Sequence, residues 1–137
     1  MKYLVDANVL SEPTRSAPDD TVIAWLAAHE ADLVVDPIVL GELEYGVLQL
    51  PAGKRRAALE KWFAGVSAAI QCLPFTGDTA GEWARLLASL RRRGVAMPMK
   101  DSLIAATALT HGLTVVTRNV RDFRSAGVAV HDPFAKR

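Results

Sequence analysis

The sequence has a single cysteine, Cys72, so no disulfide can form within the chain. That count excludes the disulfide-rich scaffolds of small secreted domains and fits a reducing cytoplasm. The sequence also lacks any apolar run near the roughly 18 residues that a membrane-spanning helix needs. Asp6 places a carboxylate too early for a secretory signal peptide. We therefore expect a cytoplasmic protein that is not embedded in a membrane.

Neither sign of charge is in excess, because 16 lysines and arginines face 15 aspartates and glutamates, a formal net charge of +1. This balance excludes a strongly basic nucleic-acid coat protein but allows a nuclease with a local basic patch. Two short basic runs are present, at residues 54–56 and 91–93. Most such runs are solvated surfaces, and in a near-neutral chain they are also the best candidates for contacts with phosphate groups.

The composition and length predict one globular domain. The 137 residues are 50% hydrophobic and 23% charged, and no repeat, low-complexity segment or linker interrupts them. A chain of this size buries roughly two thirds of the surface that its unfolded form exposes. Residues 1–137 are therefore expected to form a single domain that needs neither a disulfide nor a metal to hold its core.

Short apolar runs alternate with segments of helical periodicity along the chain. Asp36 is the expected N-cap of one helix, and Pro37 suits its first position. Predicted helices lie at residues 20–29, 37–48, 59–66, 83–93 and 101–111. Predicted strands lie at residues 3–5, 33–35, 71–74, 114–117 and 128–130. This alternation predicts an α/β fold, with a central parallel sheet flanked by helices on both faces.

Polar side chains follow two of the predicted strands directly. Asp6 comes after the first strand, and Asn119 and Asp122 come shortly after the strand at residues 114–117. In open α/β sheets, ligands bind beyond the carboxyl ends of the strands, where the strand order reverses. If these two strands are central neighbours, their polar ends meet in one crevice.

Two further acids lie on helices that could reach the same crevice. Asp101 begins a helix in which Ala105 and Ala108 share its face, and such small residues allow a close approach to the sheet. Glu42 lies one turn into the helix at residues 37–48, and Glu44 lies two residues further on. Periodicity alone hardly separates Glu42 from Glu44.

Several carboxylates in one crevice require compensation. Two such charges at about 4 Å repel by roughly 4 kcal/mol at an effective dielectric of about 20. Either their pKa values rise or a cation neutralises them. The three histidines are scattered and no zinc-type spacing occurs, so all-oxygen ligation favours Mg²⁺ or Mn²⁺. A hard cation among carboxylates suits the hydrolysis of a phosphate ester.

Each of these acids alone also has a purely structural explanation. Asp6 and Asp101 could cap the helices that follow them, Glu42 could be an exposed helix charge, and Asp122 could be a turn acid paired with a neighbouring arginine. Asp132, before a proline, is interpreted as a turn residue. The combination of the four acids is more specific than any one of them.

The same residues fall in four segments that resemble the PIN-domain ribonucleases, and within them the VapC-type toxins of bacterial toxin–antitoxin pairs. In the segment at residues 41–46, the resemblance selects Glu42 rather than Glu44. In the segment at residues 3–12, Ala7 stands where the family often has a small hydroxyl residue. The four segments occur in the family order over most of the chain, at residues 3–12, 41–46, 101–108 and 117–123.

The resemblance implies a Rossmann-like PIN domain that cleaves single-stranded regions of RNA with Mg²⁺ or Mn²⁺. It implies that Asp6 and Asp101 bind the metal, that Glu42 and Asp122 complete the acidic set, and that Asn119 orients groups by hydrogen bonds, with Asn8 as a further candidate. It also implies a homodimer and inhibition by a small antitoxin whose C-terminal tail enters the acidic crevice.

Two other functions fit part of the sequence. A haloacid-dehalogenase-like phosphatase also has an aspartate after its first strand, but it needs a second one two residues later, where this chain has Asn8. A PIN-like module could instead bind RNA without cutting it, although the presence of all four acids favours an enzyme. A dimer is also suggested by large apolar helical positions, which include Leu40, Leu48, Leu50 and Trp62.

Overall fold

A computed structural model describes residues 1–134 of the chain. Five parallel strands form one sheet in the order β3-β2-β1-β4-β5. Their bounds are β1 (Tyr3–Val5), β2 (Leu33–Val35), β3 (Gln71–Cys72), β4 (Thr114–Val116) and β5 (Val130–His131). The predicted parallel α/β sheet is confirmed, with every expected strand present.

Strands β1 and β4 are neighbours at the centre of the sheet. The polar residues that follow these two strands are therefore brought to one edge, as expected from the sequence. Leu4 lies opposite Val115, and the backbone N–H of Asp6 donates to the carbonyl of Val116 at 2.9 Å. β2 and β3 lie on one side of this pair and β5 lies beyond it on the other. The winding direction therefore reverses between β1 and β4, which opens a crevice at their carboxyl ends.

Within residues 1–134, seven α-helices connect the strands, together with two short 3₁₀ helices at residues 12–14 and 30–32. Asp36 caps one of the α-helices through its side chain, as predicted, and Asp19 caps another. The bounds are α1 (Ala7–Leu10), α2 (Asp20–Ala28), α3 (Pro37–Leu48), α4 (Lys54–Ala69), α5 (Gly77–Arg92), α6 (Met99–His111) and α7 (Val120–Arg124).

Several boundaries differ from the sequence prediction. Helices α4 and α5 begin at Lys54 and Gly77, ahead of the predicted starts at residues 59 and 83, and α4 continues to Ala69. Helix α6 begins at Met99, two residues early, because the chain enters the helix directly after Pro98, whose carbonyl accepts the first bond from Ser102. Asp101 therefore lies inside the first turn, and its interpretation as a helix cap is wrong. Strand β5 begins at Val130, because the chain first turns through Gly127, at φ 75°.

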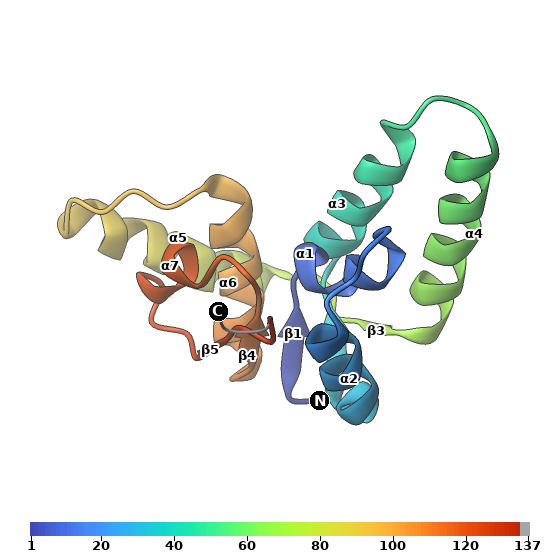
Figure 1. Cartoon of the computed structure of the whole chain (residues 1–137). Helices are drawn as coiled ribbons and strands as arrows, with labels where there is room; N and C mark the ends of the chain where they lie inside the picture. The colour runs from blue at the N-terminus through green and yellow to red at the C-terminus, as the bar shows by residue number, and fades with distance from the viewer. Residues whose placement is uncertain (135–137) are drawn as a thin grey trace.

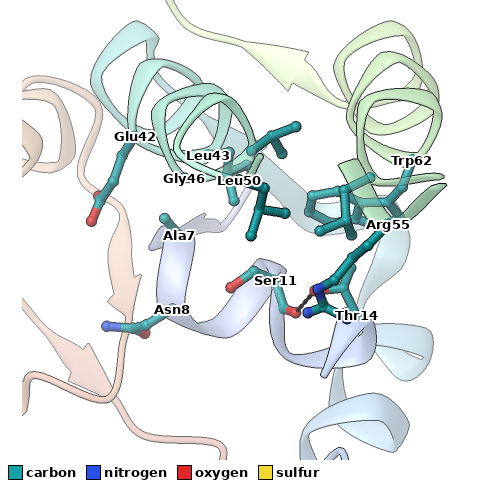
Figure 2. Close-up of a pocket in the computed structure, with 12 residues that line it drawn as sticks. Ala7, Asn8, Ser11, Thr14, Glu42, Leu43, Gly46, Leu50, Arg55 and Trp62 are labelled. Carbon is teal, nitrogen blue, oxygen red and sulfur yellow. Dashed lines mark hydrogen bonds between the residues drawn. The ribbon is translucent and has the colours of Figure 1, made fainter. Parts of the chain in front are cut away.

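The helices form two groups around the sheet. Figure 1 shows α5, α6 and α7 on one side of β1, and α2, α3 and α4 on the other. Helix α5 packs along α6, and α3 packs along α4 as an antiparallel hairpin. A pocket lies between this hairpin and α1 (Figure 2). None of the helices in residues 1–134 is long and apolar enough to cross a membrane.

The core consists of the strand side chains and the inner faces of the helices. Leu4, Val34 and Val115 are at most 1% exposed. Ala105 and Ala108 of α6 are equally buried, which confirms that small residues let this helix approach the sheet. Helix α4, in contrast, has no fully buried residue. The α3–α4 hairpin therefore projects from the core with much of its apolar surface half-exposed.

Candidate active site

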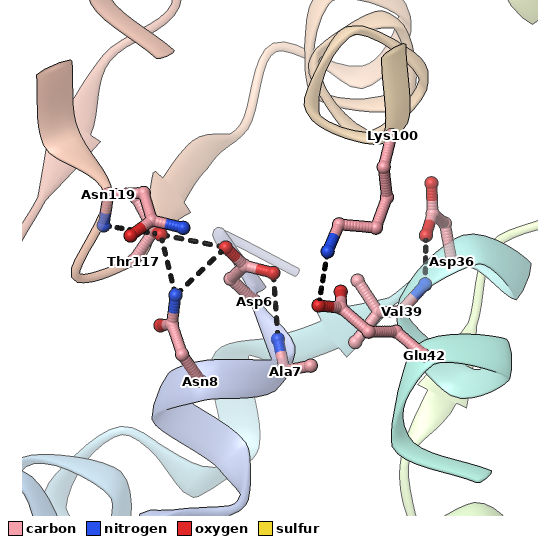
Figure 3. A network of polar contacts seen from close by, with 9 residues as sticks. All are labelled: Asp6, Ala7, Asn8, Asp36, Val39, Glu42, Lys100, Thr117 and Asn119. Carbon is pink, nitrogen blue, oxygen red and sulfur yellow. Dashed lines mark hydrogen bonds and ion pairs between the residues drawn. The ribbon is translucent and has the colours of Figure 1, made fainter. Parts of the chain in front are cut away.

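Asp6 lies at the carboxyl end of β1 and is only 2% exposed. Its Oδ1 accepts a hydrogen bond from the backbone N–H of Ala7 at 2.8 Å, so it also caps the short helix α1. Its Oδ2 accepts bonds from the Thr117 hydroxyl at 2.7 Å and from the Asn8 amide at 3.3 Å (Figure 3). Three donors therefore fix one carboxylate at the crevice.

The segment after β4 holds Asp6 in place through side chains and backbone. The Thr117 hydroxyl accepts a bond from the backbone N–H of Asn119 at 3.0 Å, and Asn8 Oδ1 accepts one from the N–H of Arg118 at 3.1 Å. Asn119 thus contributes its backbone here, while its exposed side chain makes no hydrogen bond within residues 1–134. Thr117 is a positioning residue that the sequence reasoning missed, although it begins the fourth matching segment.

Asp101 of α6 lies within the same electrostatic field as Asp6. It is 3% exposed, and burial raises its pKa to about 6. The charge of Asp6 is the next largest cause, and Asp122 and Glu42 raise the pKa further, while Lys100 opposes them. Asp101 is therefore coupled to all three of the other predicted acids, and the structure brings the four together.

The pKa of Asp6 is raised as well. Burial is the main cause, and the charge of Glu42 adds to it. The hydrogen bonds from Thr117 and Ala7 and the charge of Lys100 act in the opposite direction. Desolvation and carboxylate repulsion therefore disfavour full ionisation of the crevice, as expected for acids gathered without a full countercharge.

Glu42 and Lys100 form the one ion pair at this site within residues 1–134. Lys100 Nζ donates to Glu42 Oε2 at 2.6 Å, and this bond is the main reason why the pKa of Lys100 is raised. Half of the Lys100 side chain is exposed, so the pair contributes little to folding. Sequence reasoning missed Lys100, and its only signal was its place beside Asp101.

The remaining expectations are resolved by exposure and contacts. Glu42 is half-buried beside the crevice, whereas Glu44 is exposed, so the choice between them agrees with the structure. Asp122 lies on α7, half-buried, and forms no ion pair with Arg121 or Arg124. The interpretation of Asp122 as an arginine-paired turn acid is therefore wrong. Asp132 does form a turn, accepting the N–H of Phe134.

The donor chemistry of the crevice fits a hard divalent cation. The carboxylates of the crevice offer only oxygen atoms as metal ligands. One of these atoms, Glu42 Oε1, is buried and has no hydrogen-bond partner. Within residues 1–134, however, no three side chains of His, Cys, Asp or Glu are already arranged so that they could hold a metal ion. The Lys100 ammonium supplies positive charge there and occupies the second oxygen of Glu42.

Comparison with known proteins identifies the family. The family model described as PIN domain matches residues 3–128. The chain is 35% identical to VapC ribonuclease Y4jK of Sinorhizobium fredii, over 96% of each protein. It is 36% identical to toxin FitB of Neisseria gonorrhoeae, over 96% of this chain and 97% of FitB.

Solved structures agree with the sequence relationship. The crystal structure of FitAcB from Neisseria gonorrhoeae superposes with a TM-score of 0.87 at 34% identity, over 96% of this chain and 97% of that one. The match thus extends over the whole fold, including the strands and helices that carry the four acids. The chain belongs to the PIN-domain family, among the VapC-type ribonucleases.

Proposed function

We propose that this chain is an endoribonuclease that hydrolyses RNA phosphodiester bonds as the toxin of a toxin–antitoxin pair. The observation that carries the proposal is the convergence of Asp6, Glu42, Asp101 and Asp122 at the carboxyl ends of β1 and β4. Relatives named as a VapC ribonuclease and a toxin support the substrate and the role.

The proposal includes Mg²⁺ or Mn²⁺, with Asp6 and Asp101 as direct ligands and with Glu42 and Asp122 completing the set. Such an ion, when bound, polarises the phosphoryl group and lowers the pKa of an attacking water. The unpartnered Oε1 of Glu42 and the raised pKa values of Asp6 and Asp101 support it, because a cation would relieve both.

Other residues of the chain orient the acids and contact the substrate. Thr117, Asn8 and the N–H of Ala7 hold Asp6 in one orientation, which limits the motion of the acid that follows β1. Asp101 lies in the first turn of α6 beside Asp6, and burial and the charge of Asp6 raise its pKa to about 6 in the metal-free site. The exposed side chain of Asn119 is assigned to substrate contact at the mouth of the crevice.

Cleavage of single-stranded RNA by purified protein, with Mg²⁺ or Mn²⁺ present, tests this function. Removal of a general base or a charge-stabilising group lowers rates by about 10²–10⁴-fold, so Asp6→Asn, Asp101→Asn and Glu42→Gln should each lose most cleavage while remaining folded. Glu44→Gln, on the same helix but exposed, is the matched control and should cut like the wild type.

Two results would contradict parts of the proposal. An unchanged cleavage rate in excess EDTA would exclude the metal. RNA binding without cleavage under any divalent cation would favour the non-catalytic module instead. The phosphatase alternative loses its basis, because the chain belongs to the PIN-domain family and the Asn8 amide donates to Asp6 where a second acid would be needed.

The remaining parts of the proposal concern the protein's surroundings. A protein antitoxin as partner is supported by the similarity to toxin FitB and to the FitAcB structure. We propose that the tail of this antitoxin reaches the acidic crevice. An RNA substrate and the free, exposed Cys72 suit the cytoplasm. One sheet and one core within residues 1–134 support a single domain over residues 1–137.

A further inference from the structure

A pocket of about 340 Å³ lies directly beside the acidic crevice, between α1 and the α3–α4 hairpin. Figure 2 shows Glu42 and Asn8 at the end of the pocket nearest the crevice and Arg55 at the opposite end. Glu42 belongs to both features, since its carboxylate also pairs with Lys100. The pocket and the acidic crevice therefore share the Glu42 side chain.

The walls of the pocket combine apolar and aromatic side chains with two hydroxyl groups. Leu50, Leu59 and the half-buried Trp62 form one wall. Ser11 and Thr14 lie across from Arg55, and the Thr14 hydroxyl donates to the carbonyl of Ser11 at 2.7 Å. A planar, partly polar group fits these surroundings, because its faces meet apolar side chains and its edge meets hydroxyls.

Arg55 is a cation that has no partner within residues 1–134, and it lies at the end of the pocket away from Glu42. Its neighbour Arg56 is engaged, with Nε 3.5 Å from Glu60 and Nη1 3.4 Å from the carbonyl of Leu50. Arg55 makes no hydrogen bond or ion pair with any residue from 1 to 134, and its guanidinium points toward Ser11 and Thr14 in Figure 2. The basic run at residues 54–56 therefore directs one free guanidinium into the pocket.

We propose that the pocket holds one nucleotide of single-stranded RNA beside the bond that is cut, with its base against Trp62 and a neighbouring phosphate on Arg55. This inference rests on the proposed ribonuclease function. A guanidinium matches phosphate oxygens, and aromatic side chains stack on bases of any sequence. Only an unpaired base can leave its stack to enter, so duplex RNA is excluded.

Trp62 and the guanidinium of Arg55, which has no partner within residues 1–134, favour RNA as the occupant of the pocket. The scissile phosphodiester must lie at Asp6 and Asp101, and the next nucleotide along the strand meets the pocket through Glu42. The RNA backbone then reaches Arg55 at the far end of the pocket, where the guanidinium can neutralise the next phosphate.

Binding of a labelled single-stranded RNA oligonucleotide, followed by fluorescence anisotropy in an Asp6→Asn background, tests the proposal. Arg55→Gln should weaken binding by about 5–10-fold and lower the slope of log K against log salt by about 0.7, the loss of one phosphate contact. Lys61→Gln, an exposed cation on the same helix outside the pocket, should change neither quantity.

Tryptophan emission gives a second, independent measurement. RNA should quench the emission of the Asp6→Asn protein, and Trp62→Phe should remove most of that quenching. Trp25→Phe should retain it, because Trp25 packs against Tyr3 and His29 away from the pocket. Quenching that survives Trp62→Phe would overturn the placement of the base.

Wild-type cleavage, measured alongside, separates this inference from the proposed function. If the wild type cuts RNA but Arg55→Gln binds it as tightly as the control, the subsite is wrong and the ribonuclease stands. If Arg55→Gln weakens only the binding of a protein partner, the pocket is a protein-docking site and the proposal is overturned. If the wild type neither binds nor cuts single-stranded RNA, both proposals fail.

Discussion

Lys100 is the residue whose position most alters the expected chemistry of the acids. It pairs with Glu42, and its charge opposes the rise in the pKa values of Asp6 and Asp101. The Lys100 ammonium thus carries part of the neutralisation that the sequence assigned wholly to a metal. A divalent ion at the unpartnered Oε1 of Glu42 would lie beside the ammonium on Oε2, so the two positive charges would repel each other.

Lys100→Met should therefore raise the affinity for Mn²⁺. A half-exposed ion pair is worth about 0.2–1 kcal/mol, so the dissociation constant measured by calorimetry should fall by roughly 1.4- to fivefold. Lys61→Met, which changes an exposed lysine outside the crevice, is the control. Weaker Mn²⁺ binding by Lys100→Met would show that the ammonium supports the bound ion rather than repelling it.

Asp36 provides a pH-dependent contribution to stability that does not involve the acidic crevice. It is fully buried, and burial raises its pKa against the opposing bonds from the N–H of Val39 and the hydroxyl of Thr107. Because the folded pKa lies above the unfolded value of 3.8, this group stabilises the fold most below pH 3.8. That stabilisation is lost as the pH rises through the folded pKa.

Asp36→Asn removes the buried charge and keeps an oxygen that can accept from Val39. We expect the variant to gain stability relative to the wild type as the pH rises from 3.8 through the folded pKa. Thermal unfolding at pH 4 and pH 7 measures this difference. Asp78→Asn, at an exposed position in the first turn of α5, is the control. A difference that shrinks with rising pH would contradict the assignment.

Among individual residues, the sequence predicted the positions of the acids better than those of the side chains that contact them. Asp6, Asn119 and Asp122 follow strands, and strand ends are readable from apolar runs. Thr117 and Lys100 were not predictable in the same way, because their roles depend on contacts with Asp6 and Glu42 across 111 and 58 positions of the chain. Such contacts exist only once the sheet has set the distances.

Among the elements, α6 is the one whose packing sets the position of Asp101. Its inward residues Ala105 and Ala108 are at most 1% exposed, which brings the helix axis close to the sheet. Sequence periodicity was sufficient to predict this approach. It was not sufficient to place the helix start at Met99, because that boundary depends on the backbone at Pro98.

Ala105→Leu should push α6 away from the sheet and separate Asp101 from Asp6. Overpacking of this kind costs about 1–3 kcal/mol of unfolding free energy, and RNA cleavage should fall by more than the folded fraction falls. Urea unfolding and cleavage rates measure the two effects. Ala84→Leu, at an exposed position of α5, should change neither. Full activity in a folded Ala105→Leu protein would contradict this role of α6.

For the molecule as a whole, two of the five large apolar side chains that are exposed within residues 1–134 lie on the α3–α4 hairpin. These are Tyr45 and Leu48 of α3, which are 63% and 52% exposed, and Leu48 lines a second pocket together with Phe63. Of the apolar positions that suggested a dimer, Leu40 packs against the core, and Leu50 and Trp62 line the pocket. Leu48 remains the candidate contact between two copies.

We expect the protein to be a dimer at micromolar concentration, held in part through Leu48. Leu48→Glu should shift the mass measured by light scattering toward the 14.8 kDa of one chain, because a buried unpaired charge opposes the contact. Ile23→Glu, at another exposed apolar position, should leave the dimer intact. A wild-type mass of one chain would exclude the dimer outright.

The position of β1 between β2 and β4 has a consequence for synthesis. An emerging polypeptide pairs β1 with β2 early, but β4 starts only at Thr114, and Asp101 and Asp122 flank it. A fragment that ends before residue 114 therefore carries Asp6, Glu42 and Asp101 but lacks β4, the neighbour of β1, and Asp122. The four acids cannot all meet until most of the chain has been synthesised, so we expect incomplete chains to lack cleavage activity.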